Sequence, residues 1–346
     1  MKRSEEDIMR KWNKASDGPL VSIRCITYNH ANFIRKTLDG FLQQDTDFPF
    51  EILIHDDAST DETEDIIREY EKKYPHIIVA MYEEENQLSR GNSILFRKLI
   101  NEKLRGKYVA WCEGDDCWTD KSKLQRQIDY LEEHPDYSLC YHPVEYISEE
   151  DKIVGDDTRF KCDCDVDTRT IIARGGLFCA TCSLVYRKED FLYWPRFRMM
   201  ADIEDYPLQI HLALRGKVRY INRIMGAYRV ASSGSWTATM KRDSQKMLAH
   251  YKNERKWLRT LDHYTQGQYR NEIRWHIVDM VFDSLVPAGI YSKRKAWHMW
   301  FALEPGKDKL ILGLRAVTHD LREIIKTRLP FIRDWYKALR FGKRNG

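Results

Sequence analysis

The chain has 346 residues, of which 42% are hydrophobic and 32% are charged, and its net charge is +4. This length and apolar content allow one large domain with a substantial core, or one domain with an extension. No apolar run approaches the ~18 residues that cross a bilayer, and residues 1–18 form a polar leader unlike a signal peptide. We therefore expect a cytoplasmic protein with free thiols, because disulfides are rare in that compartment.

Charge is divided unevenly along the sequence. Residues 241–346 contain 23 Lys and Arg but 11 Asp and Glu, so this part is basic and the part before it is acidic. An acidic part suits a metal-binding enzyme, and a basic part suits an anionic surface such as lipid. Solvated helix faces rich in Lys and Arg would give the same pattern. Peripheral contact with the inner face of an anionic membrane through 241–346 is therefore one of two open interpretations.

Strand and helix patterns alternate in the first third of the chain. Strands are predicted at 20–26, 50–54, 77–82 and 108–112, and helices at 33–44, 59–73 and 92–104. The pair Ser59 and Glu62 predicts a capping box at the start of the second helix. This alternation predicts an α/β fold with a mostly parallel, helix-covered sheet.

The second part of the chain is less regular. A helix is predicted at 123–133, a strand at 138–147, a loop or insertion at 148–167, a strand at 183–187, a helix at 206–214 and a strand at 218–228. After Trp236 the pattern is helical to the end. We therefore expect the leader 1–18, an α/β domain at 19–240 and a basic helical extension at 241–346.

Polar and aromatic residues follow several of the predicted strands. These residues are Tyr28, Asp56, Asp57, Asp115 and Asp116. In open α/β sheets, ligands bind beyond the carboxyl ends of the strands. The strand ends are therefore expected to converge on one acidic, aromatic-lined site.

The segment Glu113-Gly114-Asp115-Asp116 follows the most apolar of these strands. Paired carboxylates at the end of a buried strand lose hydration and repel each other, so a divalent cation with oxygen ligands would stabilise them. Gly114 would let the backbone approach a ligand closely. The alternative is a solvated turn whose acids cap the following helix.

Three segments together resemble the family 2 glycosyltransferases of the GT-A fold. They are Val21-Ser-Ile-Arg-Cys-Ile-Thr-Tyr-Asn29, Ile54-His-Asp-Asp-Ala-Ser-Thr-Asp61 and Cys112-Glu-Gly-Asp-Asp-Cys-Trp118. The resemblance implies a nucleotide-sugar donor, a Mn²⁺ or Mg²⁺ ion and inversion at the anomeric carbon. By position it implies that the donor is bound by Thr27, Tyr28, Asn29, Asp57 and Asp115. Asp116 would be the main protein ligand of the metal.

The resemblance also indicates a general base in the second half of the domain. Family members carry an Asp followed by an aromatic residue and Pro, which matches Asp205 best, with Glu204 in reserve. A carboxylate here could take the proton from an acceptor hydroxyl. These acids would also suit a helix N-terminus for electrostatic reasons alone. The chain departs from the family pattern at Ala231, where many relatives have a His, so the remaining metal ligands stay unassigned.

These features predict an inverting, metal-dependent glycosyltransferase that moves a sugar from a UDP-sugar to a hydroxyl of a glycan or lipid-linked acceptor, with no nucleic-acid partner. One alternative is a nucleotidyltransferase, although the segment 27–32 lacks the Gly and basic residues of a phosphate loop. The other is a non-catalytic module that binds nucleotides or glycans, which would bind UDP without turnover.

Overall fold

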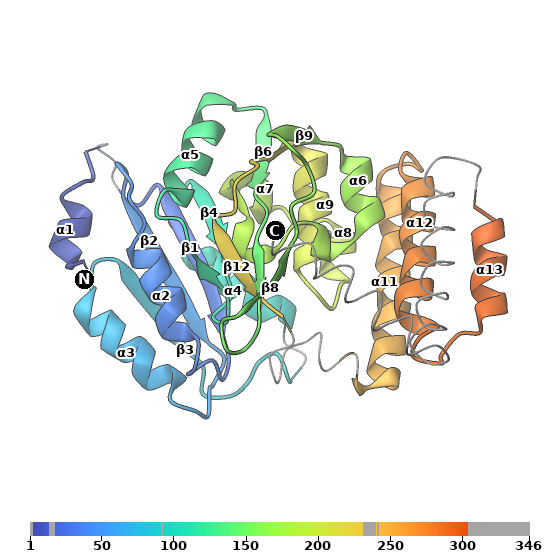
Figure 1. The fold of residues 1–346 in the computed structure, drawn as a ribbon, viewed down its shortest axis with the longest axis horizontal. Helices are drawn as coiled ribbons and strands as arrows, with labels where there is room; N and C mark the ends of the chain where they lie inside the picture. Colours follow the sequence, from blue (N-terminus) through green and yellow to red (C-terminus); the bar gives the residue numbers. More distant parts are fainter. Residues whose placement is uncertain (1–2, 14–17, 91–92, 231–239, 241, 304–346) are drawn as a thin grey trace, which may run out of the picture.

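The fold is a central sheet with helices on both faces and a group of helices at one end (Figure 1). The computed structural model describes residues 3–13, 18–90, 93–230, 240 and 242–303. The larger sheet contains β1 (Val21–Thr27), β2 (Phe50–Asp56), β3 (Ile78–Tyr82), β4 (Tyr108–Trp111), β6 (Tyr137–Tyr141), β9 (Cys164–Val166), β10 (Val185–Arg187) and β11 (Lys217–Tyr220). Their order is β3-β2-β1-β4-β10-β6-β11-β9.

The neighbouring pairs β3–β2, β2–β1 and β1–β4 are parallel, as is β6–β11, whereas β10 and β9 run antiparallel to their neighbours. The predicted α/β class with a mostly parallel sheet is confirmed. Helices α2 (Ile34–Leu42), α3 (Thr63–Lys73), α4 (Ser93–Lys103) and α5 (Lys123–Glu133) connect the strands of the first half, and a short α1 (Glu5–Met9) precedes them. The carboxyl ends of β1, β2 and β4 therefore share one edge of the sheet.

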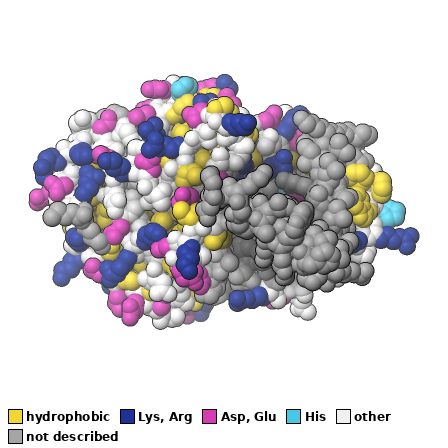
Figure 2. All heavy atoms as spheres, in the orientation of Figure 1, with side chains coloured by type: hydrophobic (Ala, Val, Ile, Leu, Met, Phe, Trp, Pro, Cys, Tyr) yellow, Lys and Arg dark blue, Asp and Glu magenta, His cyan; other side chains and the backbone are white. Residues whose placement is uncertain are grey.

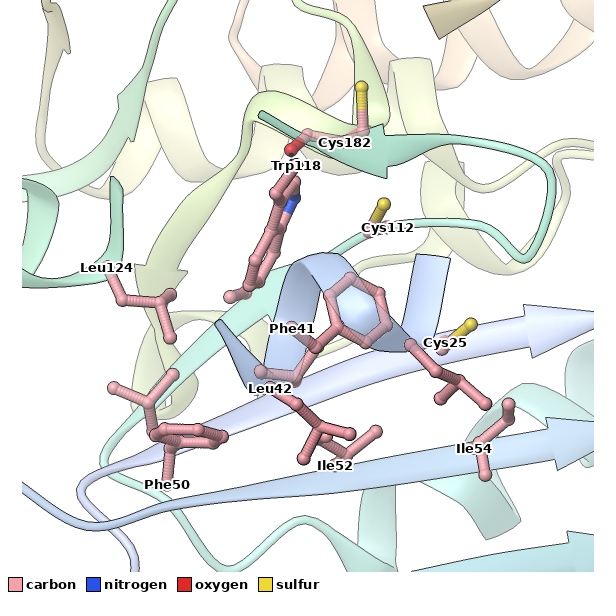
Figure 3. Packing of buried hydrophobic residues seen from close by; sticks show 14 of the residues in the cluster. Cys25, Phe41, Leu42, Phe50, Ile52, Ile54, Cys112, Trp118, Leu124 and Cys182 are labelled. Atoms are coloured by element: carbon pink, nitrogen blue, oxygen red, sulfur yellow. Dashed lines mark hydrogen bonds between the residues drawn. The ribbon is translucent and has the colours of Figure 1, made fainter. Parts of the chain in front are cut away.

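Side chains alternate between the two faces of the sheet, as strand geometry requires. Along β2, Ile52 and Ile54 belong to one buried cluster, whereas Leu53 between them belongs to another. Figure 3 shows the first cluster, in which Phe41 of α2 lies close to Trp118. The indole N–H of Trp118 donates to the carbonyl of Cys182 at 2.8 Å, which satisfies its buried polar atom.

A smaller sheet in the order β5-β12-β7-β8 lies beside the site. It is formed by β5 (Cys117–Trp118), β12 (Gly226–Arg229), β7 (Glu145–Ile147) and β8 (Ile153–Asp156). The single strand predicted at 138–147 is therefore two strands in different sheets. Pro143 lies between them and has no N–H for a continuous ladder.

Two other predictions for this region were wrong. The strand predicted at 218–228 is divided into β11 and β12, and the stretch 148–167 predicted as a loop contains β8 and β9. All four residues of β8 are exposed, including Ile153 and Val154, so this strand lacks the alternation of apolar and polar residues that a core-facing strand shows. Edge strands of this kind are formed by pairing with a neighbour and leave little signal in the sequence.

Two further groups of helices complete the described part. Near the sheet lie α6 (Thr168–Arg174), α7 (Lys188–Leu192), α8 (Arg196–Met199), α9 (Asp205–Arg215) and the short 3₁₀ turns η1 (Gly176–Phe178) and η2 (Thr181–Ser183). At the far end lie α11 (Ser244–Tyr264), α12 (Arg270–Met280), the π-helical turn η3 (Val281–Leu285) and α13 (Lys293–Phe301). Residues 304–346 lie outside the described part.

The first two C-terminal helices share a core with the α/β part. Trp257, Leu258 and Leu261 of α11 and Ile273 of α12 are buried in the same cluster as Tyr206 of α9. The predicted boundary between 240 and 241 is not tested by this packing and stays a prediction. Helices α11 and α12 therefore pack against α9, the helix that begins with Asp205.

Helix α13 lies farther out. Trp297 and Trp300 pack against a separate cluster formed with α11, α12 and η3, whereas Phe301 is 67% exposed. Figure 2 shows hydrophobic side chains at this end of the molecule beside Lys and Arg side chains. Within the described residues, no helix has the length and the apolar composition needed to cross a membrane. The helical pattern predicted beyond residue 303 lies outside the described residues.

Candidate active site

The loops that follow β1 and β2 are bonded to each other. The N–H of Asp57 donates to the carbonyl of Thr27 at 3.0 Å. The N–H of Asn29 donates to Ser59 Oγ at 2.9 Å, and Asn29 Oδ1 accepts from the N–H of Thr60 at 2.7 Å. Asn29 has a positive φ of 55°, which Asn tolerates better than most residues. The two strand ends therefore form one continuous surface.

Ser59 does not cap the helix that follows it, so the predicted capping box was wrong. Its hydroxyl donates to Asp56 Oδ1 at 2.5 Å, and α3 begins only at Thr63, after a Glu62 N-cap without a side-chain hydrogen bond. Asp61 accepts from the N–H of Thr63 at 3.0 Å instead. Ser59 thus belongs to the site loop rather than to the helix.

The two residues predicted to hold the nucleobase differ in exposure. Tyr28 is 42% exposed, so its ring is accessible for stacking. Asp57 is 2% exposed, and its carboxylate accepts from the N–H groups of Gln87 at 2.7 Å and Leu88 at 3.1 Å. Asp57 therefore orders the loop after β3. Its contact with a base stays a prediction.

The acidic segment after β4 meets the loop after β1 at Gly114. A Cβ on Gly114 would lie 2.5 Å from Thr27 Oγ1 and 2.9 Å from His30 Nδ1, so only glycine fits without movement. Thr27 Oγ1 and His30 Nδ1 are 3.1 Å apart, and His30 Nε2 lies 4.0 Å from Asp115 Oδ2. Asp115 keeps 19% of its side chain exposed. The predicted convergence of the β1, β2 and β4 ends is present in the structure.

Asp116 is more deeply buried than its neighbour. It is 2% exposed, and Oδ1 accepts from the N–H of Arg229 at 2.8 Å. Its other oxygen, Oδ2, is buried without a hydrogen-bond partner among the described residues. Burial raises the pKa of Asp116 well above its usual value, and the neighbouring Asp115 carboxylate adds to the shift, while Arg229 and the Cys182 thiol oppose it. A buried carboxylate oxygen without a donor is a suitable ligand for a hard cation.

Arg229 holds the acidic segment in place. Its side chain is 1% exposed, Nε donates to the carbonyl of Asp115 at 2.9 Å, and its other nitrogens donate to the carbonyl of Ser148 at 2.5 Å and to Asp151 Oδ1 at 2.7 Å. Its guanidinium lies over the ring of Phe33 at 4.2 Å. These contacts join β12, the Asp115–Asp116 loop and the β7–β8 turn.

A buried ion pair lies beneath the site. Arg24 of β1 is fully buried and donates to Glu204 Oε2 at 2.7 Å. Burial raises the pKa of Glu113 to about 7, although the Arg24 guanidinium opposes the shift. Glu204, which was the reserve candidate for the base, is 7% exposed, and its carboxylate is ion-paired with Arg24. This pair ties the central strand to the start of α9.

Asp205 is the first residue of α9, and the neighbouring Glu204 ties the start of this helix to Arg24 of β1. Its Oδ2 lies 3.3 Å from where a Cβ on Gly176 would be. Burial raises the pKa of Tyr228, and the carboxylates of Asp116, Asp115 and Asp205 raise it further. Tyr228 of β12 therefore lies within electrostatic range of the carboxylates predicted for metal, donor and base. The Arg24–Glu204 ion pair holds the start of α9 to β1, which pairs with β4.

The comparisons with known proteins concern the family and the fold of the chain. The model of the family Glycosyl transferase family 2 matches residues 22–192. TuaG of Bacillus subtilis, assigned to teichuronic acid biosynthesis as a glycosyltransferase, is 30% identical over 234 residues, which cover 64% of this chain and 85% of TuaG. The chain belongs to glycosyl transferase family 2.

Other relatives of this family 2 chain extend over similar regions. An uncharacterized protein of Mycobacterium tuberculosis is 36% identical over 216 residues, and the match spans 62% of this chain but only 60% of that relative. The Escherichia coli protein WfaP, a UDP-Glc:alpha-D-GlcNAc-diphosphoundecaprenol beta-1,3-glucosyltransferase, is 28% identical over 212 residues, covering 61% and 77% of the two chains. The crystal structure of S. aureus TarS 1–349 in complex with UDP-GlcNAc has a TM-score of 0.59 at 17% identity, covering 81% and 78%. At that identity the likeness concerns the fold.

Three residues of this family 2 site were not predicted from the sequence. His30 directly follows the motif that ends at Asn29, and Tyr228 and Arg229 stand at the end of the strand pattern predicted at 218–228, but nothing in their spacing marks them as site residues. The polar side chain of Arg229 in an otherwise strand-like segment is the only available signal. Its burial beside Asp116 depends on the pairing of β12 with β5, which the sequence does not reveal.

One position of the family pattern lies outside the described residues. It is Ala231, where many relatives have a His, so the remaining metal ligands stay unassigned. Within the described part, no group of three or more His, Cys, Asp and Glu side chains is arranged to hold a metal ion. A metal in this site would therefore take ligands beyond the described side chains.

Proposed function

We propose that this family 2 chain transfers a sugar from a UDP-sugar to an acceptor hydroxyl with inversion at the anomeric carbon. The observation that carries this proposal is the Arg24–Glu204 ion pair, which ties the start of α9, and with it Asp205, to the strand β1 that pairs with β4. The carboxylates of Asp115, Asp116 and Asp205 also raise the pKa of Tyr228. Asp115 and Asp116, proposed to bind the donor and the metal, follow β4, and Asp205, proposed to deprotonate the acceptor, begins α9. An inverting transfer needs groups on both sides of the anomeric carbon.

The donor would lie along the loops after β1, β2 and β4. Tyr28 would stack on the base, and Asp57 and the Thr27–Asn29 loop would contact the nucleoside. Asp115 would accept from a hydroxyl of the ribose or sugar. The choice of uracil is supported by WfaP, whose name gives a UDP-sugar as its donor.

Asp116 would hold a Mn²⁺ or Mg²⁺ ion through Oδ2. This oxygen fits the role because it is buried and has no donor among the described residues, and because these ions accept one or two carboxylates together with phosphate oxygens and water. When bound, the ion would neutralise charge on the leaving diphosphate, worth several kcal/mol in the transition state. Arg229 would fix the carboxylate through its N–H to Oδ1.

Asp205 would act as the general base. Its carboxylate would accept the proton of the acceptor hydroxyl as the oxygen attacks the face opposite the departing nucleotide. Glu204 is the reserve candidate, but it would first have to leave Arg24, and an isolated buried Arg is costly. Asp205 is therefore the preferred base.

The acceptor is proposed to be a glycan or a lipid-linked saccharide. This rests on the relatives, since WfaP acts on a diphosphoundecaprenol-linked sugar and TuaG is assigned to teichuronic acid biosynthesis. Such an acceptor would place the protein at the inner face of a membrane. The exposed Phe301 beside Lys293–Lys295 on α13 would suit a peripheral contact there.

A thermal-shift screen of nucleotide sugars with and without Mn²⁺ tests the donor site. A ligand at 100-fold its Kd stabilises the folded state by about 2.7 kcal/mol, which gives a measurable rise in Tm. We expect a UDP-sugar with Mn²⁺ to raise the Tm more than either alone. In Asp116→Asn, Oδ1 can still accept from Arg229, but the metal-dependent part of the shift should disappear.

The matched control is Asp136→Asn, which removes a carboxylate that is 54% exposed and bonded to Lys217, outside the site. This variant should behave like the wild type. If no nucleotide sugar shifts the Tm with either metal, or if Asp116→Asn keeps the full metal-dependent shift, the donor-site proposal is wrong. Binding of UDP without any sugar transfer would favour the non-catalytic module.

A further inference from the structure

The base-bearing turn is fastened to the C-terminal helices by a chain of acid and histidine side chains. Glu254 of α11 is 3% exposed and contacts two histidines. His276 Nε2 of α12 lies 2.7 Å from Glu254 Oε1, and His250 Nε2 lies 3.3 Å from Glu254 Oε2. His250 Nδ1 in turn lies 2.8 Å from Asp202 Oδ2. The chain runs from α12 to the segment just before α9.

His250 contacts the segment just before the proposed base Asp205. Through His250, Glu254 is linked to Asp202, three residues before Asp205. Asn253 strengthens this link, because Nδ2 donates to the carbonyl of Met200 at 3.0 Å and Oδ1 accepts from the N–H of Asp202 at 3.3 Å. The segment 200–202 is thus held by α11 through both its backbone and a side chain.

His276 contacts a second segment, Gly175–Gly176, which lies against the proposed base Asp205. A Cβ on Gly175 would lie 2.7 Å from His276 Cε1, so the ring packs directly on this backbone, which has a φ of 77°. The next residue, Gly176, lies against the Asp205 carboxylate. The His276 ring also packs on Tyr206, with centroids 4.8 Å apart. Each histidine therefore supports one of the two segments between which Asp205 lies.

From this geometry we infer that Glu254, His250 and His276 are positioning residues for the base Asp205, and that α11 and α12 are thereby part of the active site. The inference rests on the proposed role of Asp205. None of the three side chains needs to touch the substrate. Burial alone would raise the pKa of Glu254, but the hydrogen bonds from both histidines lower it to about 2, so the carboxylate is ionised between them. A charged acceptor shared by two donors gives stronger and more directional hydrogen bonds than a neutral one.

The functional consequence follows from the sensitivity of proton transfer to distance. A displacement of a reacting group by about 1 Å can cost about 100-fold in rate. Loosening of either segment would shift Asp205 relative to the acceptor hydroxyl. The residues proposed for the donor, at the ends of β1, β2 and β4, take no part in this chain of contacts, so their geometry should change little. The expected effect is a loss of kcat with little change in donor binding.

The test compares wild type, Glu254→Gln, His250→Gln and His276→Gln in the full chain. Glu254→Gln replaces one carboxylate oxygen by an amide NH2 group, which cannot accept a hydrogen bond from a histidine. We expect its kcat for sugar transfer to fall by about 10- to 100-fold while the donor Kd stays within about twofold. Asp262→Asn is the matched control, because Asp262 is on α11 like Glu254 but pairs with Arg270 at 3.2 Å, outside the His250–Glu254–His276 chain.

Backbone hydrogen exchange gives a second readout that does not depend on activity. Glu254→Gln should speed exchange in both 172–178 and 200–206, His250→Gln mainly in 200–206, and His276→Gln mainly in 172–178. Unchanged exchange in both segments, or an unchanged kcat in Glu254→Gln, would overturn the inference. If the wild type turns over no nucleotide sugar, the proposed function fails separately, and the exchange pattern alone decides whether these residues position the turn.

Discussion

At the scale of single residues, Gly114 sets how closely the loops of the site approach. The space that a Cβ would need is already filled by Thr27 and His30. The loop cannot easily yield, because the N–H of Gly114 donates to the carbonyl of Ile26 at 3.0 Å and its carbonyl accepts from Thr37 Oγ1 at 3.0 Å. Gly114 therefore keeps Asp115 and Asp116 beside the end of β1.

Gly114→Ala is expected to destabilise the fold and weaken donor binding together. Overpacking of a tightly packed site costs typically about 1–3 kcal/mol. Denaturant unfolding and UDP binding measure the two effects. Gly155→Ala is the control, because a Cβ there would meet only Tyr146 at 3.8 Å, an ordinary contact. Equal stability of the two variants would show that the crowding at Gly114 is relieved at little cost.

The strand-end positions of the residues expected to bind the donor could be predicted from the sequence, and the residues that hold them could not. Tyr28, Asp57, Asp115 and Asp116 stand where buried strands end, and strand periodicity is visible in a sequence. Arg229 supports Asp116 from more than 100 positions away. Contacts of this kind depend on strand pairing and on which helix covers which face, and neither leaves a local pattern.

At the scale of elements, the same distinction separates the first and second halves of the domain. The strands β1 and β2 have seven residues each and are almost wholly buried, β4 is buried throughout, and helices alternate with the strands, so the order and type of these elements agree with the predictions within a few residues. The strands β7, β8, β9 and β12 are short and partly exposed, and they were merged or missed. The overall parallel architecture is confirmed, because it depends on the first half.

The contact of α11 with the turn before α9 should depend on pH. Burial alone would lower the pKa of His250, but the hydrogen bonds to Asp202 and Glu254 outweigh it and raise the pKa to about 9. Protonated His250 then stabilises the folded state. This contribution is complete below about pH 6.5, the unfolded value, and is lost as the pH rises through about 9. At ~1.36 kcal/mol per unit of pKa, the loss is at most about 3 kcal/mol.

Urea unfolding at about pH 6 and about pH 10 measures this loss in the wild type and in His250→Gln, and the comparison removes the titration of other groups. The wild type should lose more stability over this range than the variant. An equal loss in both proteins would mean that His250 does not gain a proton on folding. The direction of the pH effect identifies the group, because the stability contributed by an acidic residue with a lowered pKa would be lost toward low pH instead.

At the scale of the whole molecule, the site is formed by parts that are distant in the sequence. The residues proposed for donor and metal come from the first third, Asp205 from the middle, and the side chains proposed to position Asp205 from α11 and α12. The first two helices of the basic region 241–346 share a buried cluster with α9, and the membrane contact of this region stays a proposal.

The most direct test of the account is the rate of sugar transfer from a UDP-sugar by Asp205→Asn compared with the wild type, with Mn²⁺ present and donor binding measured in parallel. A general base contributes typically about 10²- to 10⁴-fold, so the account predicts a loss of kcat in that range with unchanged donor affinity and an inverted anomeric configuration in the wild-type product. Full transfer activity of Asp205→Asn, or retention of configuration, would contradict it.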